Sequence, residues 1–205
     1  MARTPQTKLG WLTAFFVDWW RGGLNNIDES STMPSRPKLP SAIVAAAKSC
    51  VGIRETGGSN KGPDLQKFFA SDWYDPNGDK PGDDGYAWCA AFVCWCVQEA
   101  MRQTGVKETA TFHAPRTPGA WDFERWSLAQ DSSTQTQKPH HGDIKVGDLV
   151  IFNFSHIGIA IRDAHDGIVH TVEGNTNSDG SREGDGVYEK SRALSLIRSR
   201  IRFTI

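Results

Sequence analysis

Apolar residues recur at helical spacing in the segment that begins at Cys89. The stripe consists of Cys89, Phe92, Val93, Cys96, Val97 and Ala100. Steps of three and four residues are typical of one buried helix face. The pattern predicts a helix from residue 89 to about 103 that packs against a sheet. Further helices are expected at 41–52, with Ser41 as N-cap, at 64–69 and around 118–129.

After Gly147 the pattern changes to short apolar or alternating runs separated by turn residues. The runs 148–152, 156–161 and 168–173 predict strands, and further strands are expected at Tyr188 and at 198–204. Residues 130–142 are rich in Ser, Thr and Gln, which favours a surface loop. Helices followed by a meander predict an α+β fold, with N-terminal helices packed on an antiparallel sheet.

Residues 1–40 look separate from the domain expected at 41–205. An apolar stripe runs from Leu9 to Trp20 at helical spacing, Gly22-Gly23 would end that helix, and 24–40 reads as a linker with three prolines. We expect this amphipathic helix to dock on the main domain. Binding to a partner, a delivery apparatus or a membrane surface are alternatives. A cleaved signal is disfavoured because Asp18 interrupts the stripe and no small-residue cleavage site follows.

Composition excludes several function classes. The chain has 205 residues and a formal net charge of −1, so it lacks the basic footprint of a nucleic-acid-binding protein. It has no apolar run of the roughly 20 residues that a transmembrane helix needs. We expect the protein to be a monomer.

Three of the four cysteines fall in one predicted helix, and none forms a CxxC pair, which argues against a zinc site. We expect reduced thiols, with Cys96 in the core and Cys94 nearer the surface. A disulfide from Cys50 to Cys94 or Cys96 stays open.

Candidate chemistry begins at Cys89, because a thiol at a helix N-terminus ionises more readily than a free thiol. If 162–167 is a hairpin loop, His156 lies opposite Glu173 on one face of the sheet, and Asn175 follows two residues on. Gly158 and Ala160 would leave room on that face for the cysteine helix. Together these residues predict a nucleophile, a base and an orienting group.

Several blocks of the sequence resemble the CHAP family of cysteine, histidine-dependent amidohydrolases and peptidases. They are 88–93 with Trp95-Cys96, 147–152 with 155–159, 171–177, and the upstream stretch 58–63. The resemblance covers about residues 41–205 and implies a papain-like fold. It implies that Cys89 is the nucleophile, His156 the general base and Glu173 the orienter, with Asn175 assisting.

The resemblance also implies cleavage of an amide bond in peptidoglycan, by an N-acetylmuramoyl-L-alanine amidase or by a stem or cross-bridge endopeptidase. The Cys89 backbone N–H is the expected oxyanion donor, and Tyr86 and Trp88 are further oxyanion or substrate-binding candidates. The main alternative is a papain-like cysteine protease or amidase on a non-wall substrate. A non-catalytic binding module is disfavoured by the complete residue set.

A wall hydrolase without a clear signal would be made in the cytoplasm and delivered to the periplasm of a target or host bacterium. Two settings fit: a phage endolysin, or an antibacterial toxin injected by a contractile secretion apparatus and neutralised in the producer by an immunity protein. We expect no cofactor. Calcium is the weak alternative, with Asp75, Asn77 and Asp79 as oxygen ligands, but Lys80 replaces the usual glycine and a solvated acidic turn is favoured.

Overall fold

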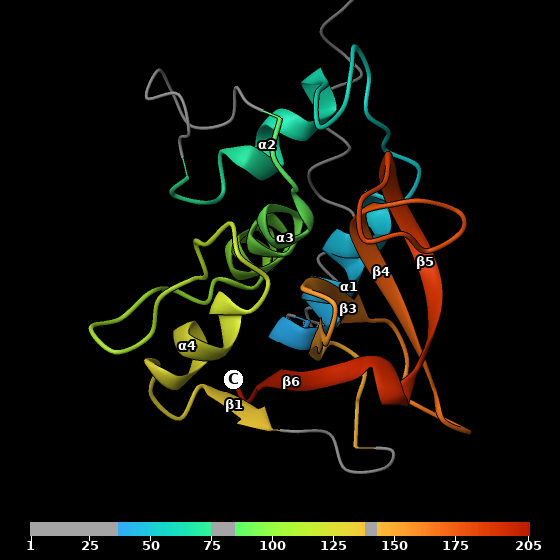
Figure 1. Cartoon of the computed structure of the whole chain (residues 1–205). Helices are drawn as coiled ribbons and strands as arrows, with labels where there is room; N and C mark the ends of the chain where they lie inside the picture. The colour runs from blue at the N-terminus through green and yellow to red at the C-terminus, as the bar shows by residue number, and fades with distance from the viewer. Residues whose placement is uncertain (1–36, 75–84, 138–142) are drawn as a thin grey trace, which may run out of the picture. The chain divides into compact units, whose positions relative to one another are not determined.

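The structure is a computed structural model that describes residues 37–74, 85–137 and 143–205 (Figure 1). The predicted helix within 1–40 and the calcium candidates Asp75, Asn77 and Asp79 lie outside these residues, so both remain predictions. Within the described ranges, no three or more His, Cys, Asp and Glu side chains form a group that could hold a metal ion. Nor does this part of the chain contain a helix with the length and apolar character of a membrane span.

The helices are α1 (Leu39–Ser49), η1 (Pro63–Leu65), α2 (Gln66–Phe69), α3 (Cys89–Thr104) and α4 (Asp122–Leu128). The prediction that Ser41 caps the first helix is wrong, because α1 starts at Leu39 after Lys38 and has Pro40 in its first turn. Proline suits that position, where the backbone N–H has no helical acceptor. The last helical residue of α3 precedes Gly105, whose φ of 76° is the left-handed cap conformation.

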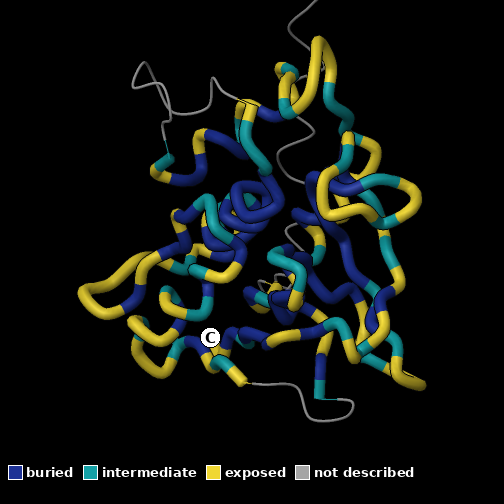
Figure 2. The backbone as a smooth tube through the Cα atoms, in the orientation of Figure 1, coloured by how far each residue is buried: buried dark blue, intermediate teal, exposed yellow. Residues whose placement is uncertain are grey.

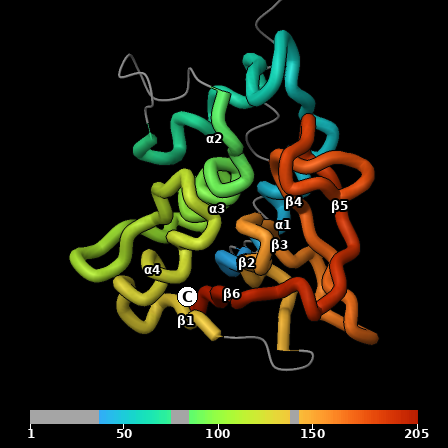
Figure 3. The backbone as a smooth tube through the Cα atoms, viewed as in Figure 1, coloured from blue at the N-terminus to red at the C-terminus, as the bar shows by residue number. Residues whose placement is uncertain are grey.

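In the described part of the chain, six antiparallel strands form one sheet in the order β1-β6-β2-β3-β4-β5. They are β1 (Thr134–Gln137), β2 (Leu149–Phe152), β3 (His156–Ala160), β4 (Ile168–Thr176), β5 (Gly186–Ala193) and β6 (Ile197–Phe203), with the short η2 (Leu194–Leu196) before the last. The expected surface loop at 130–142 is wrong for 134–137, because this polar segment pairs with β6 as an edge strand. The α+β prediction, with helices on an antiparallel sheet, is confirmed (Figure 3).

The helices cover the sheet face that carries Ile157, Ile159 and Val172. Ala160 points to the other face, where it packs with Val150 and other apolar side chains in a second, smaller core. The prediction that the Gly158 and Ala160 face receives the cysteine helix is therefore wrong. Figure 2 shows α3 as the most continuously buried helix, consistent with its contacts to α1, α2, β3 and β4.

All four cysteines are free and buried. Cys96 lies in the main core as expected. Cys94 is wrongly predicted to be near the surface, because the segment around Thr117 covers it and the Cys94 thiol donates to the Thr117 carbonyl at 3.6 Å. Burial raises the pKa of the Cys94 and Cys96 thiols far above their ordinary value, so both behave as core residues.

Candidate active site

Cys89 is the first residue of α3 and is 5% exposed. Its neighbour Trp88 occupies the N-cap position, but the Trp88 side chain makes no hydrogen bond to the helix. The first N–H groups of α3 are therefore not bound by that side chain. The Trp88 ring stacks on Phe68, and its indole N–H donates to Glu55 at 2.9 Å. These contacts fix the chain at the helix start and hold the thiol within the positive end of the helix dipole.

His156 is the first residue of β3 and is fully buried. Its ring stacks against Phe152 and Phe154, with ring centroids 5.9 and 5.8 Å away. The Nε2 atom lies 3.0 Å from the Oε2 atom of Glu173. The packing and this contact fix the plane of the imidazole, which leaves Nδ1 as its second reactive position.

The pairing of β3 with β4 differs from the sequence prediction by two residues. Ile159 pairs with Val172, and the register continued along the strands places Gly158, not His156, opposite Glu173. An error of two residues preserves the face of every side chain, because strand side chains alternate with a period of two. His156 and Glu173 therefore still share a face and meet diagonally.

Gly158 makes this diagonal contact possible. A Cβ atom at residue 158 would lie 2.7 Å from the Cγ atom of Glu173. Because glycine has no Cβ, the Glu173 side chain can pass over the strand toward His156. Gly174 has a separate role, since a Cβ there would lie 2.7 Å from Phe92 and 2.8 Å from Trp88. It lets the start of α3 approach β4.

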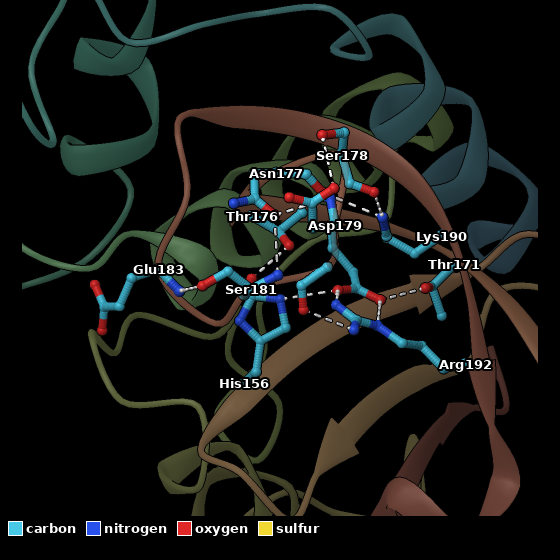
Figure 4. Close-up of polar contacts among 12 residues, drawn as sticks. His156, Thr171, Thr176, Asn177, Ser178, Asp179, Ser181, Glu183, Lys190 and Arg192 are labelled. Atoms are coloured by element: carbon cyan, nitrogen blue, oxygen red, sulfur yellow. Dashed lines mark hydrogen bonds and ion pairs between the residues drawn. The ribbon is translucent and has the colours of Figure 1, made fainter.

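Four polar contacts hold the Glu173 carboxylate. Arg192 donates from Nε to Oε1 at 2.9 Å and from Nη2 to Oε2 at 2.5 Å. The Thr171 hydroxyl donates to Oε1 at 2.5 Å, and His156 completes the set (Figure 4). Burial by itself would raise the pKa of Glu173, but the hydrogen bonds from Arg192 and His156 outweigh it and lower that pKa to about 2. Glu173 is therefore a carboxylate throughout the physiological pH range.

His156 has the opposite shift. Burial would lower its pKa, but attraction to Cys89, followed by the contact with Glu173, raises the pKa of His156 to about 9. The Nδ1 atom has no hydrogen-bond partner among the described residues, and the charge of Cys89 acts on the imidazole as a whole. The site thus favours an imidazolium held between a sulfur atom and a carboxylate.

Arg192 was not identified from the sequence. It lies on β5, pairs with Val169 of β4, and also donates to the Gly180 carbonyl at 2.9 Å. Its guanidinium lies over the Phe152 ring at 5.5 Å. The available signal was only that Lys190 and Arg192 share a strand face. Nothing in the spacing distinguishes which of the two reaches Glu173.

Asn175 lies where β4 bulges against β5. Between the pairs Glu173–Tyr188 and Thr176–Gly186, β4 contains one more residue than β5, and Asn175 has a φ of 55°. Its side chain is 1% exposed, and neither its amide nitrogen nor its amide oxygen has a hydrogen-bond partner in the described part of the chain. The structure therefore does not connect Asn175 to the His156–Glu173 pair by a hydrogen bond.

Tyr86 is half-buried between Phe69 and Tyr74. Its hydroxyl donates to the Asp72 carboxylate, at 3.0 Å from one oxygen and 2.9 Å from the other. Burial and the negative charge of Asp72 raise the pKa of Tyr86 far above its ordinary value. The single phenolic proton is therefore committed to Asp72, and the Cys89 backbone N–H remains the better oxyanion donor.

Among solved structures, a wild-type endolysin, LysIME-EF1, is similar at 16% identity and a TM-score of 0.46, over 80% of this chain and 63% of that one. No curated protein matches the chain. The model of the CHAP domain family matches residues 81–175, which include Cys89, His156, Glu173 and Asn175. Residues 81–175 are therefore similar to the CHAP domain family.

Proposed function

We propose that this protein is a peptidoglycan hydrolase that cleaves an amide bond with a cysteine nucleophile. The observation that carries the proposal is the buried His156 ring, which contacts the Glu173 carboxylate at 3.0 Å, while Cys89 stands at the start of α3. The match to the CHAP domain supports the reaction class. A nucleophile, a base and an orienting group in this order suffice for acyl transfer.

In the proposed reaction, His156 accepts the Cys89 proton, and the thiolate attacks the carbonyl carbon of the scissile amide. The carbon–sulfur bond forms as the carbonyl π electrons move to oxygen. When the tetrahedral intermediate collapses, the carbon–nitrogen bond breaks, and His156 donates its proton to the leaving amine. Water, deprotonated by His156, then hydrolyses the thioester and releases the carboxylic acid and the free thiol.

The helix start would stabilise the negative oxygen of that intermediate. Cys89 is the first residue of α3, so its backbone N–H belongs to the group that lacks an intrahelical acceptor. A donor of this kind, fixed before the reaction, is typically worth about 10²–10³ in kcat. Glu173 keeps the imidazole oriented through both steps.

The proposed substrate bond is the N-acetylmuramoyl-L-alanine amide or an amide of the stem or cross-bridge peptide. Purified sacculi incubated with the protein would distinguish these by mass spectrometry of the soluble fragments. The critical variant is Cys89→Ala, and Cys94→Ser is the matched control. Serine can keep the hydrogen bond to Thr117 and leaves the nucleophile in place.

We expect new amino termini with the wild-type protein and with Cys94→Ser, and none with Cys89→Ala. Release of stem peptides with a free L-alanine amino terminus would identify an amidase, and shortened stems or opened cross-links an endopeptidase. If wild-type protein with a cooperative thermal transition released nothing, peptidoglycan would be wrong as the substrate. Equal release by wild type and Cys89→Ala would contradict the cysteine mechanism.

We further propose that the enzyme meets its substrate in the periplasm, either at phage lysis or after injection by a secretion apparatus with an immunity protein in the producer. Expression in a laboratory Gram-negative bacterium tests the location. Protein exported to the periplasm should lyse the cells, and the same protein kept in the cytoplasm should not. Lysis by periplasmic Cys89→Ala would show that the effect does not depend on the proposed chemistry.

A further inference from the structure

A cleft of about 470 Å³ lies beside the candidate active site and is not used by the mechanism above. Its walls come from three segments of the chain: Glu55, Ser59 and Asn60; Asn175, Asn177 and Ser178; and Glu183, Gly184, Asp185 and Tyr188. A cleft of this size is within the range that holds a small molecule or a short piece of peptide. Its lining residues contain three carboxylates and no basic side chain.

The cleft is joined to the nucleophile. Glu55 accepts the hydrogen bond from the Trp88 indole at 2.9 Å, and Trp88 directly precedes Cys89. The Glu55 backbone N–H donates to the Asp185 carbonyl at 2.7 Å, so the two acidic segments lie side by side. Asn175 connects the cleft to the other side of the site, two residues after Glu173.

The negative charge of the cleft is only partly compensated by nearby cations. Glu183 pairs with Arg182 at 2.7 Å. The Arg54 guanidinium stacks over the Tyr188 ring at 3.9 Å, and Lys190 donates to the backbone carbonyls of Asn177 and Ser178. Within the described residues, neither Glu55 nor Asp185 forms an ion pair with a basic side chain. Their charges remain available to a ligand.

Asn175 supplies an independent sign of a ligand. It lines the cleft with an amide that is buried and makes no hydrogen bond to any described residue. A buried polar group without a partner costs about 1–3 kcal/mol, so such groups are retained where another molecule completes them. An amide offers one donor group and one acceptor, which is the complement of a peptide bond.

We propose that this cleft binds an ammonium-bearing residue of the peptide substrate. Glu55 and Asp185 supply the negative charge for the amine, and Asn175 pairs with an adjoining peptide group. The inference rests on the proposed function, since it makes the diamino acid of the peptidoglycan stem the residue that is recognised. Selectivity would then come from the amine, while Cys89 and His156 carry out the cleavage.

The test is a binding measurement with the inactive Cys89→Ala protein, by isothermal titration calorimetry. The two probes are stem peptides that differ only at the side-chain amine of the diamino acid, which is free in one and acetylated in the other. The measurement is repeated in Cys89→Ala with Glu55→Gln and Asp185→Asn added. These changes remove charge but keep the acceptors for Trp88 and for the Tyr188 hydroxyl.

The matched control adds Glu189→Gln to Cys89→Ala. Glu189 is an exposed glutamate on β5, next to Tyr188 in the chain but outside the cleft. We expect the free-amine peptide to bind about tenfold more tightly than the acetylated one. The preference should fall to about twofold or less with Glu55→Gln and Asp185→Asn, and should be unchanged with Glu189→Gln. Asn175→Ala should weaken both peptides equally.

Equal affinity for the two peptides would overturn the proposal, as would a preference that survives loss of both carboxylates. Unchanged binding by Asn175→Ala would show that the Asn175 amide does not contact the peptide, which contradicts that part of the proposal. The sacculus digestion separates this result from the proposed function. Hydrolysis without amine preference refutes only the cleft, whereas amine preference without hydrolysis keeps the cleft as an amine-binding site and refutes the wall substrate.

Discussion

The guanidinium of Arg192 binds both carboxylate oxygens of Glu173, at 2.9 and 2.5 Å. Glu173 is fully buried, and a buried carboxylate is stable only when its charge is paired and hydrogen-bonded. Arg192 meets that requirement, and its Nη2 shares the Oε2 atom of Glu173 with the Nε2 atom of His156. It is therefore a positioning residue, which acts on the reaction through Glu173 and His156.

Arg192→Gln should raise the pKa of Glu173, because it removes the strongest of the contacts that lower it. Activity requires the ionised carboxylate, so the acid limb of kcat/KM against pH should move to higher pH. The uncompensated charge should also lower the free energy of unfolding by about 3 kcal/mol. The measurements are a pH–rate profile and urea denaturation. An acid limb that stays in place would show that Arg192 has a structural role only.

Arg198→Gln is the control for that change. Arg198 pairs with Glu124 at 2.9 Å on an exposed part of β6, outside the candidate site. Its loss should leave the pH–rate profile unchanged. Arg192→Lys should restore part of the acid-limb position, because lysine returns the charge but lacks the paired N–H groups of a guanidinium.

Gly158→Ala should reduce kcat/KM by roughly 10²-fold while the fold persists. The new methyl group would meet the Glu173 side chain at 2.7 Å and displace the carboxylate from His156. A misplacement of about 1 Å in a catalytic group can cost this much. Steady-state kinetics, with near-ultraviolet circular dichroism to confirm native packing, checks the expectation. Wild-type kcat/KM would mean that Glu173 reaches His156 by another path.

Gly174→Ala should instead act on stability. Its methyl group would collide with Phe92 and Trp88, both of which are buried and held by the core. Overpacking of this kind typically costs about 1–3 kcal/mol. Urea denaturation should report that loss. An unchanged midpoint would contradict the close approach of α3 to β4.

Stability should also depend on pH through the central pair. The pKa of Glu173 falls from 4.5 to about 2, since Arg192 and His156 outweigh burial, so its contribution is complete above 4.5 and is lost as pH falls toward 2. The pKa of His156 rises from 6.5 to about 9, since Cys89 and Glu173 outweigh burial. Its contribution is complete below 6.5 and is lost as pH rises through 9. The free energy of unfolding should therefore be maximal between pH 4.5 and pH 6.5, where both contributions are complete.

Thermal denaturation across pH 3–10 measures this dependence. His156→Gln should flatten the alkaline decline. His170→Gln is the control, since His170 is only half-buried and contacts Ser191 at 3.0 Å on a different part of β4. An alkaline decline of equal size in wild type and His156→Gln would assign it to other groups.

The sequence by itself determined the local structure. The helical spacing from Cys89 onward predicted α3, and three apolar runs predicted β2, β3 and β4. It also determined which residues alternate with His156 along β3 and with Glu173 along β4, because the period of two that governs strand side chains is local. The resemblance of these blocks to the CHAP family followed from the same short segments.

Only the tertiary structure decided how those segments meet. The register of β3 on β4 differs by two residues from the prediction, because it depends on packing and on the turn that joins the strands. The bulge that separates Asn175 from the central pair arises from pairing with β5. Arg192 reaches Glu173 only because β5 lies beside β4. Contacts of this kind join residues that are far apart in the sequence. The whole fold sets the distance between them in space, and the pattern of residues along the chain does not contain that distance.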